Sequence, residues 1–270
     1  MTSTGGSLMP SVKTAAVITH GREGVGDAVE RLRRVAQKAG VELYEDADGH
    51  TPDIAIVLGG DGTMLRALTR FLGTGVPVIG VNYGRVGFLT AIKADELEQG
   101  IARVFAGEYR QIELATVEVT VGDTHAVAVN DVVVAGGTLG RMVELSYAIG
   151  GEELGVQPCD GLICATPGGS TAYNLSNGGP VLVWGIDAMV LTFVAPHSLH
   201  IRPLVVPRGA QVDITNETLG METTVLVDGH RVAGLATGAK ASVKIGEQHS
   251  VLATLPDVTF FRRYAAVFGR

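Results

Sequence analysis

A strand that runs through a glycine turn into a helix constrains the fold of this chain more than any other stretch. The run Asp53–Leu58 is apolar and rich in β-branched residues, which is typical of a buried parallel strand. The segment Thr63–Leu72 places its leucines on one helical face. The turn between them reads Leu-Gly-Gly-Asp-Gly-Thr. The sequence therefore predicts a strand, a glycine turn and a helix in direct succession.

The turn combines three glycines with one carboxylate. Gly59, Gly60 and Gly62 leave the backbone amides unshielded and free to take positive φ, so an anion can approach the helix N-terminus closely. Because a carboxylate repels a phosphate, the presence of Asp61 favours either a metal ligand or a base that acts on a hydroxyl group. A tight turn with a helix-capping aspartate is the alternative interpretation of the same residues.

Strands and helices alternate on both sides of this turn. Strands are expected at Thr14–His20, Val41–Tyr44 and Val76–Val81, and helices at Asp27–Ala39 and Ala94–Phe105. This alternation predicts a parallel sheet covered by helices. Ligands bind such sheets at the carboxyl ends of the strands, where Gly59–Gly62 lies. A glycine loop at Gly21, Gly24 and Gly26 lacks the order of the dinucleotide fingerprint and is a weak nucleotide signal.

The pattern of the chain changes near residue 110. Short runs that alternate apolar and polar side chains, with turns between them, continue from there to Val251–Ala253. We therefore expect an α/β N-terminal domain with a parallel sheet over residues 1–110 and a mainly β, sandwich-like C-terminal domain over residues 111–255. Residues 256–270 are rich in aromatic side chains and are expected to pack back on the first domain.

The composition excludes several classes of protein. With 46% hydrophobic and 18% charged residues, the chain can bury a core and is not a disordered protein. A net charge of −7 argues against a general binder of nucleic acids or acidic membranes. The start of the chain lacks the features of a signal peptide, and the most apolar stretch, Val181–Ala195, is too short to span a bilayer. We expect a cytoplasmic protein in which Cys159 and Cys164 are buried free thiols.

Further clusters carry more polar side chains than a sandwich core requires. Asn130 and Asp131 offer an amide and a carboxylate that suit the hydroxyls of a ribose, and a β-turn is the alternative. The stretch Asp160–Pro180 ends a strand, turns at two glycines and starts a short helix, and its many hydroxyl and amide groups require a polar ligand or water. Val227–His230 is a turn by default, and the two histidines of Pro196–His200 are a weak metal pair without a partner motif.

Taken together, these motifs resemble those of the NAD kinase family, in its bacterial type. The resemblance covers about residues 14–265 and rests on stretches in the family's order: Gly59–Thr63, Val81–Asn82, Gly87–Thr90, Asn130–Asp131, Asp160–Ile163 and Thr166–Tyr173. The Gly-Gly-Asp-Gly-Thr turn alone is shared with diacylglycerol and sphingosine kinases. The Asn-Asp pair and the Gly-Ser-Thr-Ala-Tyr stretch make the resemblance specific.

The resemblance implies phosphoryl transfer to the 2′-hydroxyl of the adenosine ribose of NAD, with Mg²⁺ or Mn²⁺ and with ATP, or in some members polyphosphate, as donor. Asp61 would be the catalytic base. The other residues that it implies in substrate and nucleotide binding are Gly59, Gly60, Gly62, Arg66, Asn82, Phe88, Asn130, Asp131, Arg141, Asp160, Ser170, Thr171, Ala172, Tyr173, Asn174, Ser176 and His230. It also implies an active site between the two domains and a homodimer or homotetramer. No nucleic acid or membrane partner is expected, and no dedicated protein metal site is evident.

Two positions depart from the family pattern. Gly168 stands where a threonine is usual and removes a hydroxyl, and His230 stands where a glutamine is usual and brings a side chain whose charge depends on pH. Two other functions stay open from the sequence alone. One is a lipid kinase of the diacylglycerol type, which shares the glycine turn, and the other is a non-catalytic NAD-binding sensor.

Overall fold

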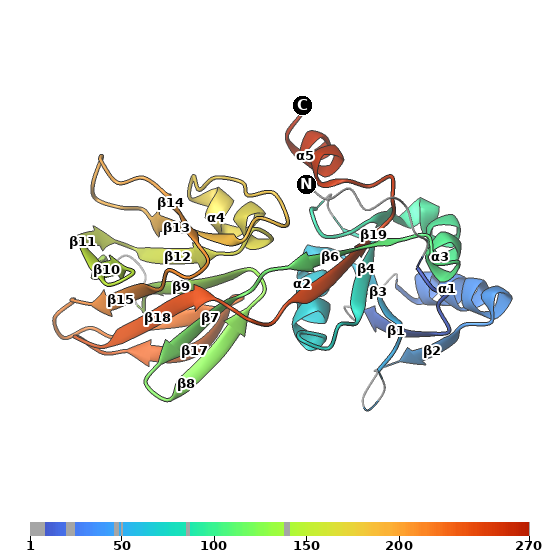
Figure 1. The fold of residues 1–270 in the computed structure, drawn as a ribbon, viewed down its shortest axis with the longest axis horizontal. Helices are drawn as coiled ribbons and strands as arrows, with labels where there is room; N and C mark the ends of the chain where they lie inside the picture. The colour runs from blue at the N-terminus through green and yellow to red at the C-terminus, as the bar shows by residue number, and fades with distance from the viewer. Residues whose placement is uncertain are drawn as a thin grey trace. The chain divides into compact units, whose positions relative to one another are not determined.

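The chain forms two compact units (Figure 1). Unit 1 comprises residues 1–113 and 250–270, and unit 2 comprises residues 114–249. The computed structural model describes residues 9–19, 25–45, 49, 51–84, 87–137 and 141–269. Gly21 and Gly24 of the first glycine loop therefore lie outside the described residues.

A seven-stranded sheet forms the centre of unit 1, in the order β2-β1-β3-β4-β19-β6 with β5 beside β4. Its strands are β1 (Thr14–Thr19), β2 (Glu42–Glu45), β3 (Ile54–Gly59), β4 (Pro77–Asn82), β5 (Ile92–Lys93), β6 (Arg110–Leu114) and β19 (Ser250–Thr254). The pairs β2–β1, β1–β3, β3–β4, β4–β19 and β4–β5 are all parallel. Parallel sheets are covered on both faces, which explains why every residue of β3 is buried.

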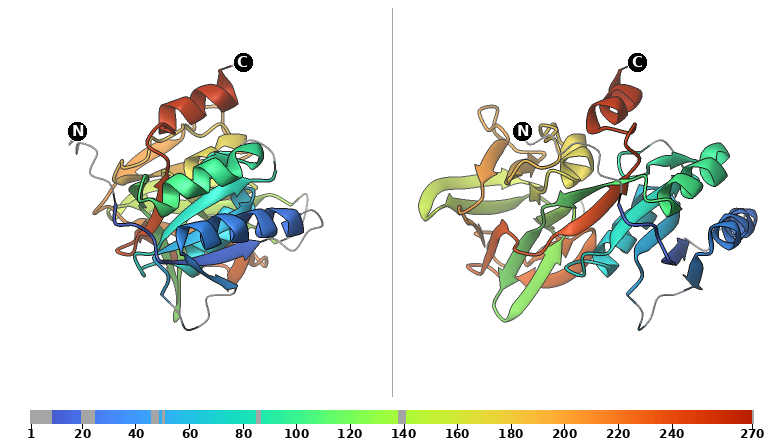
Figure 2. Two further views of the ribbon diagram at one scale, coloured as in Figure 1. Left: turned by 90° about the vertical axis from the view of Figure 1, so that its right-hand side faces the viewer. Right: turned by 45° about the vertical axis from the view of Figure 1, so that its right-hand side comes forward.

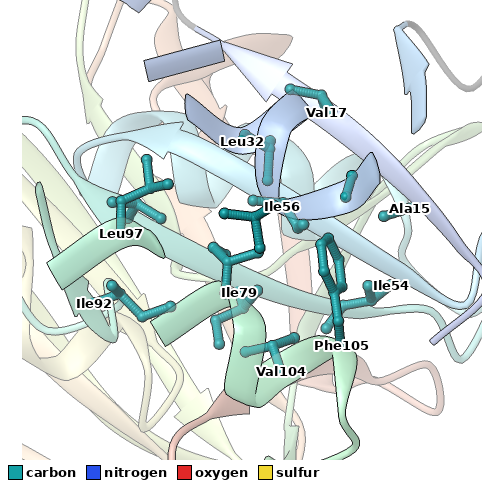
Figure 3. Close-up of a cluster of buried hydrophobic side chains, with 14 of the residues drawn as sticks. Ala15, Val17, Leu32, Ile54, Ile56, Ile79, Ile92, Leu97, Val104 and Phe105 are labelled. Carbon is teal, nitrogen blue, oxygen red and sulfur yellow. The ribbon is translucent and has the colours of Figure 1, made fainter. Parts of the chain in front are cut away.

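Helices cover both faces of this sheet. They are α1 (Val25–Ala39), α2 (Asp61–Arg70) and α3 (Leu97–Phe105), the last preceded by the 3₁₀ turn η1 (Ala94–Glu96). α1 and α3 lie side by side (Figure 2), and Leu32 and Leu97 join Ile79 of β4 in one buried cluster (Figure 3). Gly80 points to the other face, because side chains alternate along a strand, and a Cβ there would lie 2.5 Å from the Met64 sulfur of α2. α2 therefore covers the opposite face.

The strand at Val251–Ala253 packs with unit 1, whereas the expected β-rich domain over residues 111–255 includes it. As β19 it lies between β4 and β6 and pairs in parallel with β4. Ser250 Oγ donates a hydrogen bond of 2.9 Å to the carbonyl of Leu68 in α2. A short apolar run fits a sandwich core and a parallel sheet equally well, so its pattern does not distinguish the two.

The C-terminal helix, α5 (Phe260–Phe268), is also part of unit 1. Its first turn is capped by Thr259, whose side chain accepts a hydrogen bond from the backbone N–H of Arg262. The ring of Phe88 lies 5.9 Å from the ring of Phe260 and 5.5 Å from that of Phe268. These aromatic contacts hold α5 against the segment that follows β4.

Two six-stranded antiparallel sheets make up unit 2, in the orders β11-β10-β15-β18-β7-β8 and β14-β13-β12-β9-β16-β17. Their strands are β7 (Val117–Val121), β8 (Thr124–Ala128), β9 (Asp131–Gly136), β10 (Val143–Ile149), β11 (Glu152–Cys159), β12 (Gly161–Ala165), β13 (Ala188–Val194), β14 (Leu204–Pro207), β15 (Val212–Asn216), β16 (Thr223–Val227), β17 (His230–Leu235) and β18 (Lys240–Ile245). Leu145 and Val243 of the first sheet share one buried cluster with Val134 and Leu162 of the second. The sheets therefore pack face to face as a sandwich.

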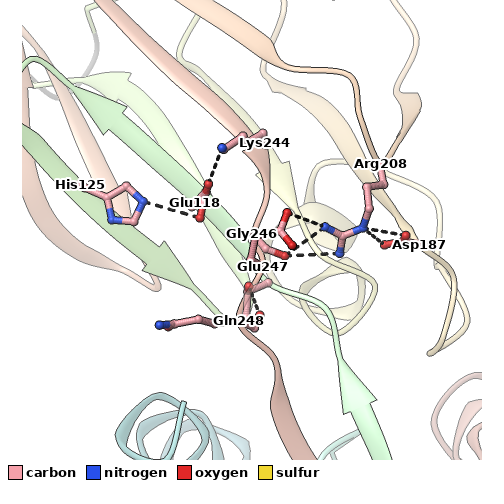
Figure 4. Close-up of polar contacts among 9 residues, drawn as sticks. Glu118, His125, Asp187, Arg208, Lys244, Gly246, Glu247 and Gln248 are labelled. Atoms are coloured by element: carbon pink, nitrogen blue, oxygen red, sulfur yellow. Dashed lines mark hydrogen bonds and ion pairs between the residues drawn. The ribbon is translucent and has the colours of Figure 1, made fainter. Parts of the chain in front are cut away.

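The two segments by which the chain enters and leaves unit 2 are tied together. The N–H of Gly246 donates to the carbonyl of Thr116 (2.9 Å), and Thr116 Oγ1 donates to the carbonyl of Gln248 (2.5 Å). Arg208 donates to the carboxylate of Asp187 (2.7 Å) and to the carbonyl of Gly246 (3.3 Å) (Figure 4). These bonds fix both connecting segments to the sandwich.

Candidate active site

The glycine turn forms the start of α2. The helix begins at Asp61, earlier than the leucine pattern indicates, with Gly60 as its N-cap residue. Gly60 has a φ of −104°, and neither Gly59 nor Gly62 has a positive φ, so this turn does not use the freedom of glycine to take positive φ. Gly59 is instead required by packing, because a Cβ there would lie 2.6 Å from Oγ1 of Thr63.

Among the residues that the structure describes, packing does not require a glycine at position 60 or 62. A Cβ at either position would meet no described heavy atom within 4 Å. The first N–H groups of a helix have no acceptor inside the helix, and they carry partial positive charge. Bare backbone beside such groups is typical of sites where a phosphate approaches closely. The geometry at the start of α2 therefore suits an anion.

Two backbone N–H groups hold the carboxylate of Asp61. Phe88 N donates to Oδ2 (2.7 Å) and Leu89 N donates to Oδ1 (3.1 Å). The preceding residue has to be glycine, because a Cβ on Gly87 would lie 2.3 Å from Oδ2. Asp61 itself is only partly buried, so the remaining lone pairs of its oxygens can meet a substrate hydroxyl. The carboxylate is therefore both fixed in direction and accessible.

The other expected residues of unit 1 differ in exposure. Asn82 ends β4, and its Oδ1 accepts a hydrogen bond of 2.8 Å from the N–H of Gly84. Phe88 is 5% exposed and packs its ring on α5, so its backbone rather than its ring meets the carboxylate of the turn. Arg66 is exposed on α2, where it lines a cavity of about 630 Å³ together with Arg70.

In unit 2, a hairpin turn anchors the Asn-Asp pair that opens β9. Asp228 lies between β16 and β17 with a φ of 48°. Its carboxylate accepts hydrogen bonds from the N–H groups of Val129 (2.9 Å), Asn130 (2.7 Å) and Asp131 (3.2 Å). The sequence interpretation of Asp228 as an ordinary turn residue misses this anchoring role. The sequence signal that could have indicated this role is an aspartate directly before a glycine at the tip of a hairpin.

Asp131 is buried, with 6% of its surface exposed. Burial, helped by the nearby charge of Asp228, raises the pKa of Asp131 from 3.8 to about 7. Near neutral pH such a carboxyl group exists in both forms, so it can accept a hydrogen bond or donate one. Both abilities suit a pair of ribose hydroxyls.

The raised pKa of Asp131 makes the stability of the protein depend on pH. The folded protein binds the proton of Asp131 more tightly than the unfolded chain does. The stability that this proton contributes is therefore present at low pH and is lost as pH rises through the folded pKa of about 7. We expect the stability of Asp131→Asn relative to the natural protein to increase by roughly 2–3 kcal/mol from about pH 5 to about pH 8. Urea unfolding at both pH values measures this. The exposed Asp123→Asn serves as the control, and an equal pH dependence in all three proteins would contradict the prediction.

The polar stretch after β12 forms η2 (Gly169–Thr171) and α4 (Tyr173–Ser176). Ser170 and Asn174 are fully buried there. Ser170 Oγ donates to the carbonyl of Pro167 (2.7 Å), and Asn174 Nδ2 donates to that of Ser170 (2.9 Å). Asn174 Oδ1 accepts from Thr192 Oγ1 (2.6 Å). The fold itself therefore satisfies these two side chains, so the expected need of this stretch for a ligand or water concerns its other polar groups.

The rest of this stretch is more accessible and adjoins the Asn-Asp pair. Thr171 and Ala172 are partly buried, and Tyr173 and Ser176 are exposed. The carbonyl of Asn130 accepts a hydrogen bond of 2.8 Å from the N–H of Thr166, and a Cβ on Gly169 would lie 2.1 Å from the same oxygen. His230 is exposed at the start of β17, next to the Asp228 turn. One end of this sheet therefore gathers the Asn-Asp pair, η2 and the hairpin.

Asp160 and Arg141 lie at the other end of the same strands. Ala165 of β12 lies opposite Asp131 of β9, whereas the carbonyl of Asp160 accepts a hydrogen bond of 3.1 Å from Gly136 N at the far end of β9. The carbonyl of Arg141 is also next to Gly136. At the rise of an extended strand, Gly136 is about 20 Å along the chain direction from Asn130. Asp160 and Arg141 therefore do not converge with Asn130 on one nucleoside within this unit.

The remaining expectations concern metals, thiols and membranes. His197 and His200 are exposed, and within the described ranges no group of three His, Cys, Asp or Glu side chains could hold a metal ion. Cys159 and Cys164 are free and buried, as expected, and burial raises the pKa of each to about 12. Of the helices that the structure describes, none has the length and apolar character needed to cross a membrane.

Solved structures share this fold. The crystal structure of yeast NADH kinase complexed with NADH matches with a TM-score of 0.83 at 21% sequence identity, over 96% of this chain and 88% of that one. The structure of an NAD kinase from Archaeoglobus fulgidus in complex with ATP matches with a TM-score of 0.78 at 26% identity, over 95% of this chain and 97% of that one. The expected α/β domain followed by a mainly β domain is confirmed. The fold and the glycine turn therefore place this chain in the structural class of these kinases.

Sequence comparisons identify the family within that class. The ATP-NAD kinase N-terminal domain matches residues 23–109, and the ATP-NAD kinase C-terminal domain matches residues 129–255. The NAD kinase of Gemmatimonas aurantiaca is 38% identical over 247 residues, which are 89% of this chain and 84% of that protein. The NAD kinase of Heliobacterium modesticaldum is 37% identical over 215 residues, or 78% and 76% of the two chains. The chain belongs to the NAD kinase family.

Proposed function

We propose that this protein transfers the γ-phosphoryl group of ATP to the 2′-hydroxyl of the adenosine ribose of NAD, which yields NADP and ADP. The observation that carries the proposal is the carboxylate of Asp61, fixed by two N–H groups beside the bare backbone of Gly60 and Gly62. This arrangement puts a base next to a place that suits a phosphate. Membership of the NAD kinase family supports ATP and NAD as the two substrates.

Asp61 would act as the base in this reaction. A ribose hydroxyl is a poor nucleophile near neutral pH, so an aspartate within hydrogen-bond reach orients it and accepts its proton as the new P–O bond forms. The bond from the transferred phosphorus to the bridging oxygen of ADP breaks in the same step, and ADP takes the negative charge. The bonds from Phe88 N and Leu89 N support this role, because they fix the direction of the carboxylate and leave lone pairs available.

The start of α2 would stabilise the charge of the donor phosphates. Its N–H groups and the open backbone at Gly60 and Gly62 are preorganised for negative charge, which is a large contribution to catalysis in phosphoryl transfer. Arg66 is exposed one turn further along the helix and would add positive charge. Polyphosphate offers the same anionic groups as ATP, so this geometry fits either donor.

The nucleoside of NAD would bind at the end of the sheet that carries the Asn-Asp pair. Asn130 and Asp131 would hold ribose hydroxyls, and Thr171, Ala172, Tyr173, Ser176 and His230 would form the surrounding contacts. Ser170 and Asn174 bond inward, so we propose that they support η2 and α4 rather than touch NAD through their side chains. Asn82 would contribute at the carboxyl end of β4.

A second copy of the chain would complete the site. Asp160 and Arg141 belong to the expected set, but they lie about 20 Å along the strands from Asn130. In a homodimer or homotetramer, the neighbouring copy would bring these two residues to the nucleotide. A light-scattering mass of one 28.1 kDa chain under assay conditions would contradict this arrangement.

Mg²⁺ or Mn²⁺ would accompany ATP in this proposal. The described side chains form no three-residue metal group, so the donor set fits an ion held mainly by phosphate oxygens, as is usual for Mg²⁺ with nucleotides. When bound, such an ion neutralises phosphate charge. The expected cytoplasmic location stays a prediction.

Incubation with NAD, ATP and Mg²⁺ tests the function directly. We expect NADP, detected with an NADP-specific dehydrogenase, and a phosphorus resonance typical of a 2′-phosphate. Parallel reactions with polyphosphate and with NADH define the donor and the acceptor. A rise in melting temperature with NAD but without product would support the sensor, and phosphorylation of diacylglycerol instead would support the lipid kinase.

Gly60→Ala separates ligand binding from folding. The backbone of Gly60 suits alanine, with a φ of −104°, and the new Cβ would meet no described atom within 4 Å. We therefore expect an unchanged melting temperature but a KM for ATP raised by roughly tenfold, because the methyl group keeps phosphates from the N–H groups. Thermal unfolding and initial rates measure the two effects. An unchanged KM for the donor would contradict a phosphate site at this turn.

A further inference from the structure

A buried arginine of the C-terminal helix contacts the segment that holds Asp61. Arg263 is 6% exposed. Its guanidinium donates to the carbonyl oxygens of Phe88 and Thr90, the second at 2.6 Å, and to Oγ1 of Thr254 at 3.0 Å. Arginine is seldom buried to this degree unless its N–H groups are paired, because desolvating the charge is costly. A buried cation therefore binds directly to the backbone of Phe88 and Thr90.

The same stretch is held from its other side by the carboxylate. The N–H groups of Phe88 and Leu89 donate to Asp61, and the carbonyl groups on either side of Leu89 accept from Arg263. Burial lowers the pKa of Arg263 to about 10, against the opposing effect of Asp61, so the side chain stays charged near neutral pH. The cation and the carboxylate thus attract each other through one short piece of backbone.

We propose that Arg263 is a positioning residue for phosphoryl transfer: it holds the backbone of Phe88 to Thr90 so that this backbone aims the carboxylate of Asp61. This inference rests on the proposed function of Asp61 as the base. Arg263 does not touch the substrate in this proposal. Arg263 acts through the two N–H groups of this backbone. It is carried by α5, and the aromatic contacts of Phe88 with Phe260 and Phe268 fix that helix in place.

The guanidinium group suits this task better than an ammonium group. Its planar fork reaches two carbonyl groups with one nitrogen and a hydroxyl with another, in fixed relative directions. The ammonium group of lysine is a single point on a flexible stem. Arg263→Lys therefore keeps the charge but loses the geometry, which separates positioning from simple electrostatics.

The test compares Arg263→Lys with Arg262→Lys. Arg262 is the exposed neighbour in α5 and donates to the carbonyl of Asp257. We expect Arg263→Lys to lower kcat by about 10- to 100-fold, with the KM for NAD changed by less than about threefold, because a small misplacement of a reacting group has effects of this size. Arg262→Lys should match the natural protein. Equal kcat in both variants would overturn the inference.

Chemical rescue distinguishes positioning from a purely structural role. In Arg263→Ala, added guanidinium chloride at low millimolar concentration should restore part of kcat, and faster hydrogen exchange at the amides of Phe88 and Leu89 should accompany the loss. If Arg263→Ala does not fold, Thr254→Val removes one acceptor and should lower kcat by a few-fold. Lower thermal stability with normal kcat in the folded fraction would overturn the inference. No NADP from the natural protein would instead overturn the proposed function.

Discussion

Asp61→Asn is expected to lower kcat by on the order of 10²–10⁴, with little change in NAD affinity. The amide cannot accept the proton of the ribose hydroxyl, so the step loses its base, whereas the contacts that bind NAD stay in unit 2. The variant also carries a local cost. The NH₂ group of asparagine would face either Phe88 N or Leu89 N, so one N–H group loses its acceptor, which costs about 1–3 kcal/mol.

Single-turnover rates, isothermal titration with NAD and thermal unfolding measure these effects separately. Asp27→Asn provides the matched control, because Asp27 is also an acidic residue in the first turn of a helix, α1, and is exposed. We expect normal turnover in that variant. Turnover of Asp61→Asn within about threefold of the natural protein would show that the carboxylate is not the base.

Gly87→Ala is expected to lower kcat by about 10²-fold while the protein stays folded. Its Cβ would lie 2.3–2.4 Å from all three atoms of the Asp61 carboxyl group, so either the carboxylate or the segment has to move by about 1 Å. Gly87 is not among the glycines with positive φ, so the substitution does not strain the backbone directly. The effect therefore comes from the displaced base.

Kinetics and a melting curve test this second prediction. Gly26→Ala is the control, because a Cβ at that exposed position of α1 would meet no atom of the described residues within 4 Å. We expect normal kcat and equal or higher stability there, since alanine favours helix. A Gly87→Ala protein with normal kcat would mean that Asp61 tolerates displacement and does not need its observed direction.

Local patterns predicted the strand–turn–helix at the centre of unit 1 well. The structure has β3 and α2 at the expected places, because a continuous apolar run and a leucine face arise from neighbouring residues. Strand β11 carries no such local signal, because most of its residues are exposed and its sequence lacks the alternation of a half-buried strand. It lies at the edge of its sheet, where burial does not impose a pattern.

Features of the candidate site that depend on distant residues could not be predicted. The sequence identified Asp61, but the N–H groups that hold it lie 27 and 28 residues away. Arg263 reaches its carbonyl acceptors across 173 and 175 residues. Ser170 and Asn174 were assigned to a ligand, and their inward bonds depend on how η2 packs. A polar residue type indicates a need for partners and does not show which partners the fold supplies.

The place of β19 has a consequence for how the protein is made. The sheet of unit 1 is complete only when β19 enters between β4 and β6, and that strand is synthesised after all of unit 2. A ribosome therefore finishes the whole sandwich before the first unit can close. Because β19 pairs with β4, which is far away in the sequence, a long loop has to close before this pair forms, and we expect the sheet of unit 1 to fold slowly. A chain that stops before Ser250 contains the entire glycine turn yet lacks both β19 and Arg263, so an incomplete product cannot assemble the setting of Asp61.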